Sequence, residues 1–123
     1  RLNECLLANE ILNKKGIGIT LVDARFAKPL DENLIWEIAT NHEAIITIEE
    51  GSLGGFGSHV SQFLSDKNLL DNNLKFRSMI LPDKFIDHNK PEIMYKEAGL
   101  DAEAIVSKVF DVINSKVILQ KQN

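Results

Sequence analysis

The feature that most constrains the fold is a regular alternation of short apolar runs with segments of helical periodicity. The runs are rich in strand-forming residues and cover Ile17–Val22, Ala44–Ile48 and Lys75–Leu81. Between them, apolar residues recur every three or four positions, as on one face of an amphipathic helix. Strands that alternate with helices form a largely parallel sheet with helices on its faces. We therefore predict an α/β domain of three layers, a mostly parallel sheet flanked by helices.

Capping residues mark the ends of the predicted helices. Lys14 followed by Gly16 is typical of a helix C-terminus, and Asp31 and Asp101 can each cap the start of a helix. A further short helix is predicted between Lys90 and Gly99. The apolar faces comprise Leu2, Cys5, Leu6, Ile11 and Leu12; Leu34, Ile35 and Ile38; Val60, Phe63 and Leu64; and Ile105, Val106, Val109, Phe110, Ile113 and Val117.

The size and charge of the chain favour one acidic domain. Its 123 residues suffice for one core, which we assign to residues 1–118, with residues 119–123 as a frayed tail. The net charge is −4, and the 14 lysines and arginines are scattered. A nucleic-acid or anionic-membrane surface needs a basic stripe, so we expect proteins or small molecules as partners.

Cysteine content and apolar run lengths bear on the compartment. The single Cys5 lies in a helical pattern, where a buried, inert thiol is expected. No apolar run approaches the length of a membrane span, and the start of the sequence lacks the features of a signal peptide. These observations favour the cytoplasm. The helical pattern begins at the second residue without a cap, so we expect the sequence to be part of a longer chain.

A glycine-rich segment follows the second apolar run. Four of the seven glycines lie between Glu49 and His59, which indicates a constrained turn from a strand into a helix. A nucleoside-triphosphate loop would need a lysine after its last glycine, and no lysine occurs between Asp31 and Asp66. A dinucleotide loop would need a small residue where Val60 stands. The segment therefore does not match either phosphate-binding pattern.

This segment and residues 23–28 each follow a predicted strand. Ligands and partners of open α/β sheets bind beyond the carboxyl ends of the strands, so this edge is the candidate functional surface. Glu49 and Glu50 are adjacent and must point to opposite faces, so at most one of them faces inward. An inward carboxylate could bind backbone amides of the glycine turn or pair with Arg25. A catalytic acid or base is the less favoured alternative.

Aromatic side chains in these loops favour an interface. Phe26 and Phe56 lie off any periodic face, as aromatic residues that dock against another domain often do. Arg25 could clamp a ligand anion, but an internal or interface ion pair is favoured. The residues predicted to form an interdomain or structural loop are Arg25, Phe26, Glu49, Glu50, Gly51, Gly54, Gly55, Phe56, Gly57 and His59.

No catalytic, cofactor-binding or metal-binding residues are predicted in this chain. His42, His59 and His88 lack the spacing of a metal site. Ser58 lies in the string Phe-Gly-Ser-His rather than in the GxSxG pattern of a hydrolase nucleophile.

Two strings in combination resemble a known family. Residues 23–31 read Asp-Ala-Arg-Phe-Ala-Lys-Pro-Leu-Asp, and residues 49–57 read Glu-Glu-Gly-Ser-Leu-Gly-Gly-Phe-Gly. Leu-Pro-Asp-Lys-Phe at 81–85 and Gly-Leu-Asp at 99–101 follow. Over Leu2–Ser115 the chain is similar to the C-terminal domain of 1-deoxy-D-xylulose-5-phosphate synthases, which are transketolase-like thiamin enzymes.

This resemblance implies a parent enzyme that condenses pyruvate with glyceraldehyde 3-phosphate and releases carbon dioxide, for isoprenoid, thiamin and pyridoxal precursors. Thiamin diphosphate and magnesium would lie between the two preceding domains, and their GDG motif is absent from this sequence. The resemblance implies an inactive structural domain that packs on the preceding domains and supports a homodimer. The strand that precedes the first helix in this family is missing, which would leave an exposed sheet edge.

Two alternatives remain open at this point. Terminal domains of transketolase and of the β subunits of 2-oxo-acid dehydrogenases carry a related D-x-R-x-x-K-P-L-D string. The second alternative is an independent domain that binds an anion through the glycine turn and Arg25.

Overall fold

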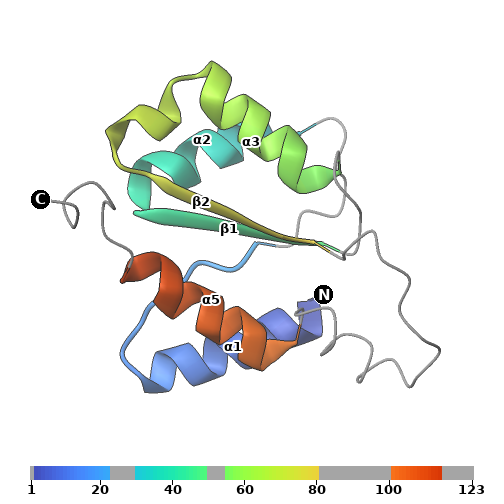
Figure 1. Cartoon of the computed structure of the whole chain (residues 1–123), viewed down its shortest axis with the longest axis vertical. Helices are drawn as coiled ribbons and strands as arrows, with labels where there is room; N and C mark the ends of the chain where they lie inside the picture. The colour runs from blue at the N-terminus through green and yellow to red at the C-terminus, as the bar shows by residue number, and fades with distance from the viewer. Residues whose placement is uncertain (1, 23–29, 50–54, 81–100, 115–123) are drawn as a thin grey trace, which may run out of the picture.

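The computed structural model describes residues 2–22, 30–49, 55–80 and 101–114, which form three layers (Figure 1). In chain order the elements are α1 (Leu2–Lys14), α2 (Glu32–Asn41), β1 (Ala44–Glu49), α3 (Phe56–Asp66), the 3-10 helix η1 (Leu69–Asn72), β2 (Lys75–Ile80) and α5 (Ala102–Ile113). The strands form the middle layer, with α2 and α3 on one face and α1 and α5 on the other (Figure 1). This arrangement confirms the predicted α/β class.

The sheet is formed by β1 and β2, which run parallel. Their register places Ala44 opposite Lys75 and Glu49 opposite Ile80. Parallel neighbours need a crossover connection, which here includes α3 and η1. The predicted strands at 44–48 and 75–81 are therefore confirmed, apart from Leu81, which lies outside the described residues.

One apolar cluster joins the sheet to α2 and α3. Its buried members are Ala39, Val60, Phe63 and Leu64. Ile45 of β1 and Phe76 of β2 pack against them from the sheet. Alternate residues of a strand point to opposite faces, so Thr47, Glu49 and Ser78 project toward these same helices.

A second cluster joins the opposite face of the sheet to α1 and α5. Ala8 of α1, Met79 of β2, and Ala102 and Ile105 of α5 are its buried members. Ile46 and Ile48 of β1 pack against this cluster. β1 is thus apolar on both faces for most of its length, as expected for a strand between two layers of helices. β2 contributes Phe76, Met79 and Ile80 to the two clusters or their surroundings, whereas its Arg77 and Ser78 are exposed.

Gly16 ends α1 as the sequence predicts. Its φ of 82° is a left-handed conformation that glycine adopts without a steric penalty. The N–H of Gly16 donates to the carbonyl of Asn13 at 3.0 Å, and the N–H of Ile17 donates to the carbonyl of Leu12 at 2.9 Å. These two bonds form a Schellman motif, which satisfies the last carbonyls of the helix.

The two predicted aspartate caps are also present. Asp31 accepts a hydrogen bond from the N–H of Leu34 at 3.1 Å, and Asp101 accepts one from the N–H of Ala104 at 2.9 Å. Each bond satisfies a donor in the first turn of its helix that has no partner within the helix. The short helix predicted between residues 90 and 99 lies outside the described residues.

The predicted strand at residues 17–22 is absent. The residues of this segment alternate between half-buried and exposed, but the segment pairs with neither β1 nor β2. Its anchor is the hydroxyl of Thr20, which lies 2.8 Å from Nε2 of His42. Nδ1 of the same ring bonds the carbonyl of Ile38 at 2.9 Å. The prediction of a buried strand was wrong here, because strand pairing depends on a neighbour distant in sequence.

Two predictions for α1 were wrong. Leu6, placed on the buried stripe, is 46% exposed. Cys5 is half-buried rather than buried, and it packs against the cluster between α1 and α5. Leu12, also placed on the predicted stripe, is buried, and Ala8 is buried beside it on this helix. The helix is rotated so that Leu6 and Leu7 face outward.

Candidate functional site

The carboxyl end of β1 and the start of α3 form the best-defined polar site. Glu49 is the last residue of β1, and its carboxylate accepts hydrogen bonds from two backbone N–H groups of α3. The bond from Phe56 measures 2.9 Å, and the second donor is Gly57. Gly55, the residue at the N-cap position, has no side chain that could make these bonds. A carboxylate from the strand therefore caps the helix.

This cap also has an electrostatic effect. The N-terminus of an α-helix carries a partial positive charge, and a carboxylate there is stabilising. Glu49 is half-buried, which weakens solvent screening of the interaction. The amides that could bind a ligand phosphate are thus already bonded to an anion of the protein itself. An incoming anion would have to displace Glu49 and would be repelled by it.

Gly57 lets α3 approach the sheet closely. It is buried, and a Cβ atom added to it would lie 2.8 Å from Oγ1 of Thr47 and closer still to Oγ of Ser78. Oε2 of Glu49, which accepts a hydrogen bond from the N–H of Gly57, would lie 3.2 Å from the same Cβ atom, so three side chains of the strands would have to shift together. This position therefore requires glycine for contact rather than for a positive φ.

Thr47 and Ser78 lie beneath Gly57 as a pair. They are opposite each other in the strand register, and the hydroxyl of Thr47 donates to Oγ of Ser78 at 3.3 Å. Thr47 is the buried polar residue of the described core. The bond satisfies its hydroxyl, whose burial would otherwise cost free energy.

A cavity of about 480 Å³ opens beside this pair. Ser58, Ser61, Gln62 and Ser65 of α3 contribute polar side chains to its wall. Among the described residues that line it, no lysine, arginine or histidine occurs. These described lining residues therefore do not supply the cation that a phosphate or diphosphate group needs. Sequence reasoning did not identify this cavity, although the serines recur at helical spacing.

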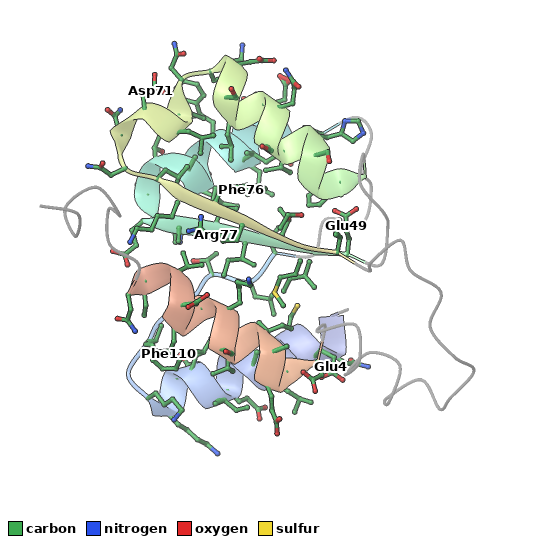
Figure 2. All side chains as sticks on the ribbon, viewed as in Figure 1. Glu4, Glu49, Asp71, Phe76, Arg77 and Phe110 are labelled. Atoms are coloured by element: carbon green, nitrogen blue, oxygen red, sulfur yellow. The ribbon has the colours of Figure 1, made fainter. Side chains whose placement is uncertain are left out.

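A second carboxylate caps a helix at the same edge. Oε2 of Glu4 accepts a hydrogen bond from the N–H of Ala102, the first residue of α5, at 2.8 Å. Figure 2 places Glu4 and Glu49 on the same side of the molecule. Sequence reasoning missed Glu4, because nothing local connects it to a residue 98 positions away.

The predicted loop residues have different outcomes. Arg25, Phe26, Glu50, Gly51 and Gly54 lie outside the described residues.

Of the remaining five, Glu49 binds amides of the glycine segment, as one sequence interpretation proposed. Gly55 and Gly57 shape the start of α3. Phe56 is not a loop residue: it begins α3, is half-buried and packs against the cluster between the sheet and α2 and α3. His59 is half-buried in the first turn of α3.

A comparison with protein families gives the context of this site. The family described as transketolase, C-terminal domain, matches residues 1–105. The chain belongs to the transketolase C-terminal domain family. The three-layer architecture is consistent with that fold. Membership fits a thiamin-diphosphate-dependent transferase as the parent enzyme.

Within residues 2–22, 30–49, 55–80 and 101–114, the donor set of this transketolase C-terminal domain does not fit thiamin diphosphate or magnesium. The amides at the start of α3 are bonded to Glu49, and the adjoining cavity lacks a cation among its described residues. In the described part of the chain, no three histidine, cysteine or acidic side chains converge as metal ligands would. In the same residues, no helix has the length and apolar character needed to cross a bilayer.

Proposed function

We propose that this chain is the C-terminal domain of a 1-deoxy-D-xylulose-5-phosphate synthase and has a structural role in that enzyme. The parent reaction condenses pyruvate with glyceraldehyde 3-phosphate and releases carbon dioxide. The strings at 23–31 and 49–57 support a thiamin enzyme of this kind, and Phe26 and the Leu-Pro-Asp-Lys-Phe string at 81–85 favour the synthase over the others. Thiamin diphosphate and magnesium would be held by the preceding domains.

The observation that carries the structural role is the bond from Glu49 to the start of α3. A helix start that is closed by the protein's own carboxylate is a rigid, nearly neutral surface rather than an anion site. Glu4 closes α5 in the same way. At both helix starts, backbone N–H groups are already hydrogen-bonded to a carboxylate. Another domain could therefore cover this edge and leave fewer backbone donors without an acceptor.

Apolar side chains beside this edge support docking. Leu6 and Leu7 of α1 are 46% and 50% exposed, and α1 begins at the edge where Glu4 lies (Figure 2). Adjacent exposed leucines provide apolar area that a domain interface would cover. We infer that this end of the domain contacts the preceding domains and supports the homodimer.

The decisive experiment uses the complete polypeptide from which this sequence comes. Purified with thiamin diphosphate and magnesium, it should consume pyruvate and glyceraldehyde 3-phosphate together, and the 123-residue chain alone should not. Activity instead with a ketose donor, or with a lipoyl acceptor, would assign transketolase or a 2-oxo-acid dehydrogenase. A coding sequence without a GDG motif upstream would also overturn the synthase assignment.

An independent anion-binding role is the competing proposal. Calorimetric titration of the 123-residue chain and of Arg25→Ala with inorganic phosphate and nucleotides tests it. The structural role predicts no saturable heat from either protein. Saturable heat that the substitution abolishes would support anion binding.

A further inference from the structure

The strand β2 has an outer edge, which faces away from β1 and which no strand covers within the described residues. Arg77 and Ser78, at successive positions in the middle of β2, are both exposed. Successive side chains of a strand point to opposite faces of the sheet, so both faces are open to solvent at this point. A strand from another molecule could therefore reach the outer edge of β2.

The first bond between the strands shows which backbone groups of β2 face the outer edge. The N–H of Lys75 donates to the carbonyl of Glu43, just before β1, at 3.0 Å. The N–H and C=O of one residue point to the same edge of a strand, and the direction alternates from residue to residue. Every second residue from Lys75 onward therefore directs these groups toward β1. The residues between them direct theirs to the outer edge, and they are Phe76, Ser78 and Ile80.

The guanidinium of Arg77 occupies one acceptor of the outer edge. Its Nη1 donates to the carbonyl of Phe76 at 2.8 Å, and Figure 2 shows both residues on β2. A strand that paired with this edge would need the same carbonyl as an acceptor, so it would have to displace a charged group. Charged side chains on edge strands oppose pairing with other chains. Arg77 therefore makes the outer edge a poor template.

The rest of β2 has the composition of a strand that pairs readily. Phe76, Met79 and Ile80 are apolar, and Lys75 at the first position is the only other charged residue of the strand. Short segments with strand-forming residues and little charge associate with identical copies of themselves. A second copy of the chain is always present at the protein's own concentration. It is therefore the partner against which this edge needs protection.

Two copies of β2 would bring their Arg77 side chains together. In an antiparallel pair about a two-fold axis, residues that bond outward must face residues that also bond outward. The registers with most overlap then place Arg77 opposite Arg77, or opposite Met79 with the two arginines on the diagonal. Side chains directly opposite have Cβ atoms about 4.5–5.5 Å apart, and those on the diagonal lie about 7–8 Å apart. Both separations are shorter than the screening length of about 10 Å in 0.1 M salt, so the charges repel.

We propose that Arg77 prevents the outer edge of β2 from pairing with a second copy of this chain. The guanidinium occupies the carbonyl of Phe76, and its charge opposes the antiparallel pairing of two β2 strands. This surface is the lateral edge of the sheet rather than the carboxyl ends of its strands. The proposal therefore rests neither on the docking role of the end with Glu4 and Glu49 nor on which thiamin enzyme the parent is.

The test compares variants of the complete polypeptide from which this sequence comes. Arg77→Val and Arg77→Gln remove the charge, and Arg77→Lys keeps it. Lys67→Val is the matched control, because it removes the same charge from an exposed position outside the sheet. Sedimentation over a range of protein concentrations reports the mass of each variant, and hydrogen exchange of individual amides reports where strands pair.

Arg77→Val and Arg77→Gln should form larger assemblies at protein concentrations about tenfold or more below those at which the unmodified protein does. In these assemblies exchange should slow about tenfold or more at the amides of Phe76, Ser78 and Ile80. The amides that alternate with them already bond toward β1, so their exchange should not change. Arg77→Lys and Lys67→Val should have the mass and the exchange rates of the unmodified protein.

Four results would overturn the proposal. The first is an unchanged mass of both neutral variants at every concentration. The second is larger assemblies with faster exchange throughout the domain, which would trace association to unfolding. The third is slower exchange at the three outer amides without a larger mass, which would assign the edge to another segment of the same polypeptide. The fourth is association of Arg77→Lys as strong as that of Arg77→Val, which would contradict the role of charge.

Discussion

Glu4 and Ala102 join the two ends of the described chain through a hydrogen bond of 2.8 Å across 98 positions. The carboxylate of Glu4 accepts from the first N–H of α5, while Asp101 accepts from Ala104 in the same turn. Two of the four free donors of this helix start are thereby satisfied by acidic side chains. One of those side chains comes from α1, so the bond fixes the relative position of the two helices.

Replacement of Glu4 should weaken this contact. Glu4→Ala leaves the N–H of Ala102, a buried residue, without its acceptor, and should lower the free energy of unfolding by about 1–2 kcal/mol. Urea denaturation measures the loss. Glu10→Ala is the matched control, because Glu10 is an exposed residue of the same helix. Equal effects of the two substitutions would show that the cap contributes nothing specific.

Removal of charge from Glu49 should destabilise the start of α3. Glu49→Gln keeps one acceptor oxygen but places an NH₂ group against a backbone donor, so about 1–3 kcal/mol of stability should be lost. Hydrogen exchange of the amides of Phe56 and Gly57 should accelerate more than that of amides in α5. Glu43→Gln, at an exposed position just before β1, should leave these rates unchanged. Unaltered exchange in the Glu49 variant would argue against the cap.

A side chain at position 57 should force α3 away from the sheet. Gly57→Ala places its methyl group against Thr47 and Ser78, and overpacking of this kind typically costs about 1–3 kcal/mol. Thermal unfolding should show a lower midpoint. Gly18→Ala is a suitable comparison, because a Cβ there meets nothing within 4 Å. If both variants unfold at the temperature of the unmodified chain, the close approach at Gly57 is not required.

Gly16 tests a different property of glycine. A Cβ at this position also meets nothing within 4 Å, but the φ of 82° is unfavourable for alanine. Gly16→Ala should therefore cost about 1–2 kcal/mol through backbone strain alone. Chemical denaturation, again with Gly18→Ala beside it, measures the difference. A stability gain in the Gly16 variant would contradict the left-handed conformation.

Features that depend on neighbours in sequence were predictable. Asp31 and Gly16 mark helix ends because their bonds reach only three or four residues along the chain. The amide-bonded carboxylate at the glycine turn was also foreseen, but two glutamates were candidates. The direction of alternate side chains along β1 identifies Glu49 as the one that bonds. Glu49 lies on the same face as Thr47, and Thr47 lies beneath α3.

Features that depend on distant neighbours were not predictable. Residues 17–22 have the composition of a strand, but pairing needs a second strand at the right distance, and their composition does not reveal one. The rotation of α1 that exposes Leu6 depends on how this helix packs against α5 and the sheet. The bond from Glu4 to Ala102 gives no sequence signal, because glutamates are common on exposed helix faces as well.

The layer formed by α1 and α5 has a consequence for synthesis on the ribosome. α1 leaves the ribosome before the two strands and α5 leaves after them, yet each buries apolar side chains against the other. The chain between them can form β1, α3 and β2 while Ala8 still lacks its partners on α5. Domains fold as units during translation. We therefore expect this domain to acquire resistance to proteolysis in a single late step, after α5 has left the exit tunnel.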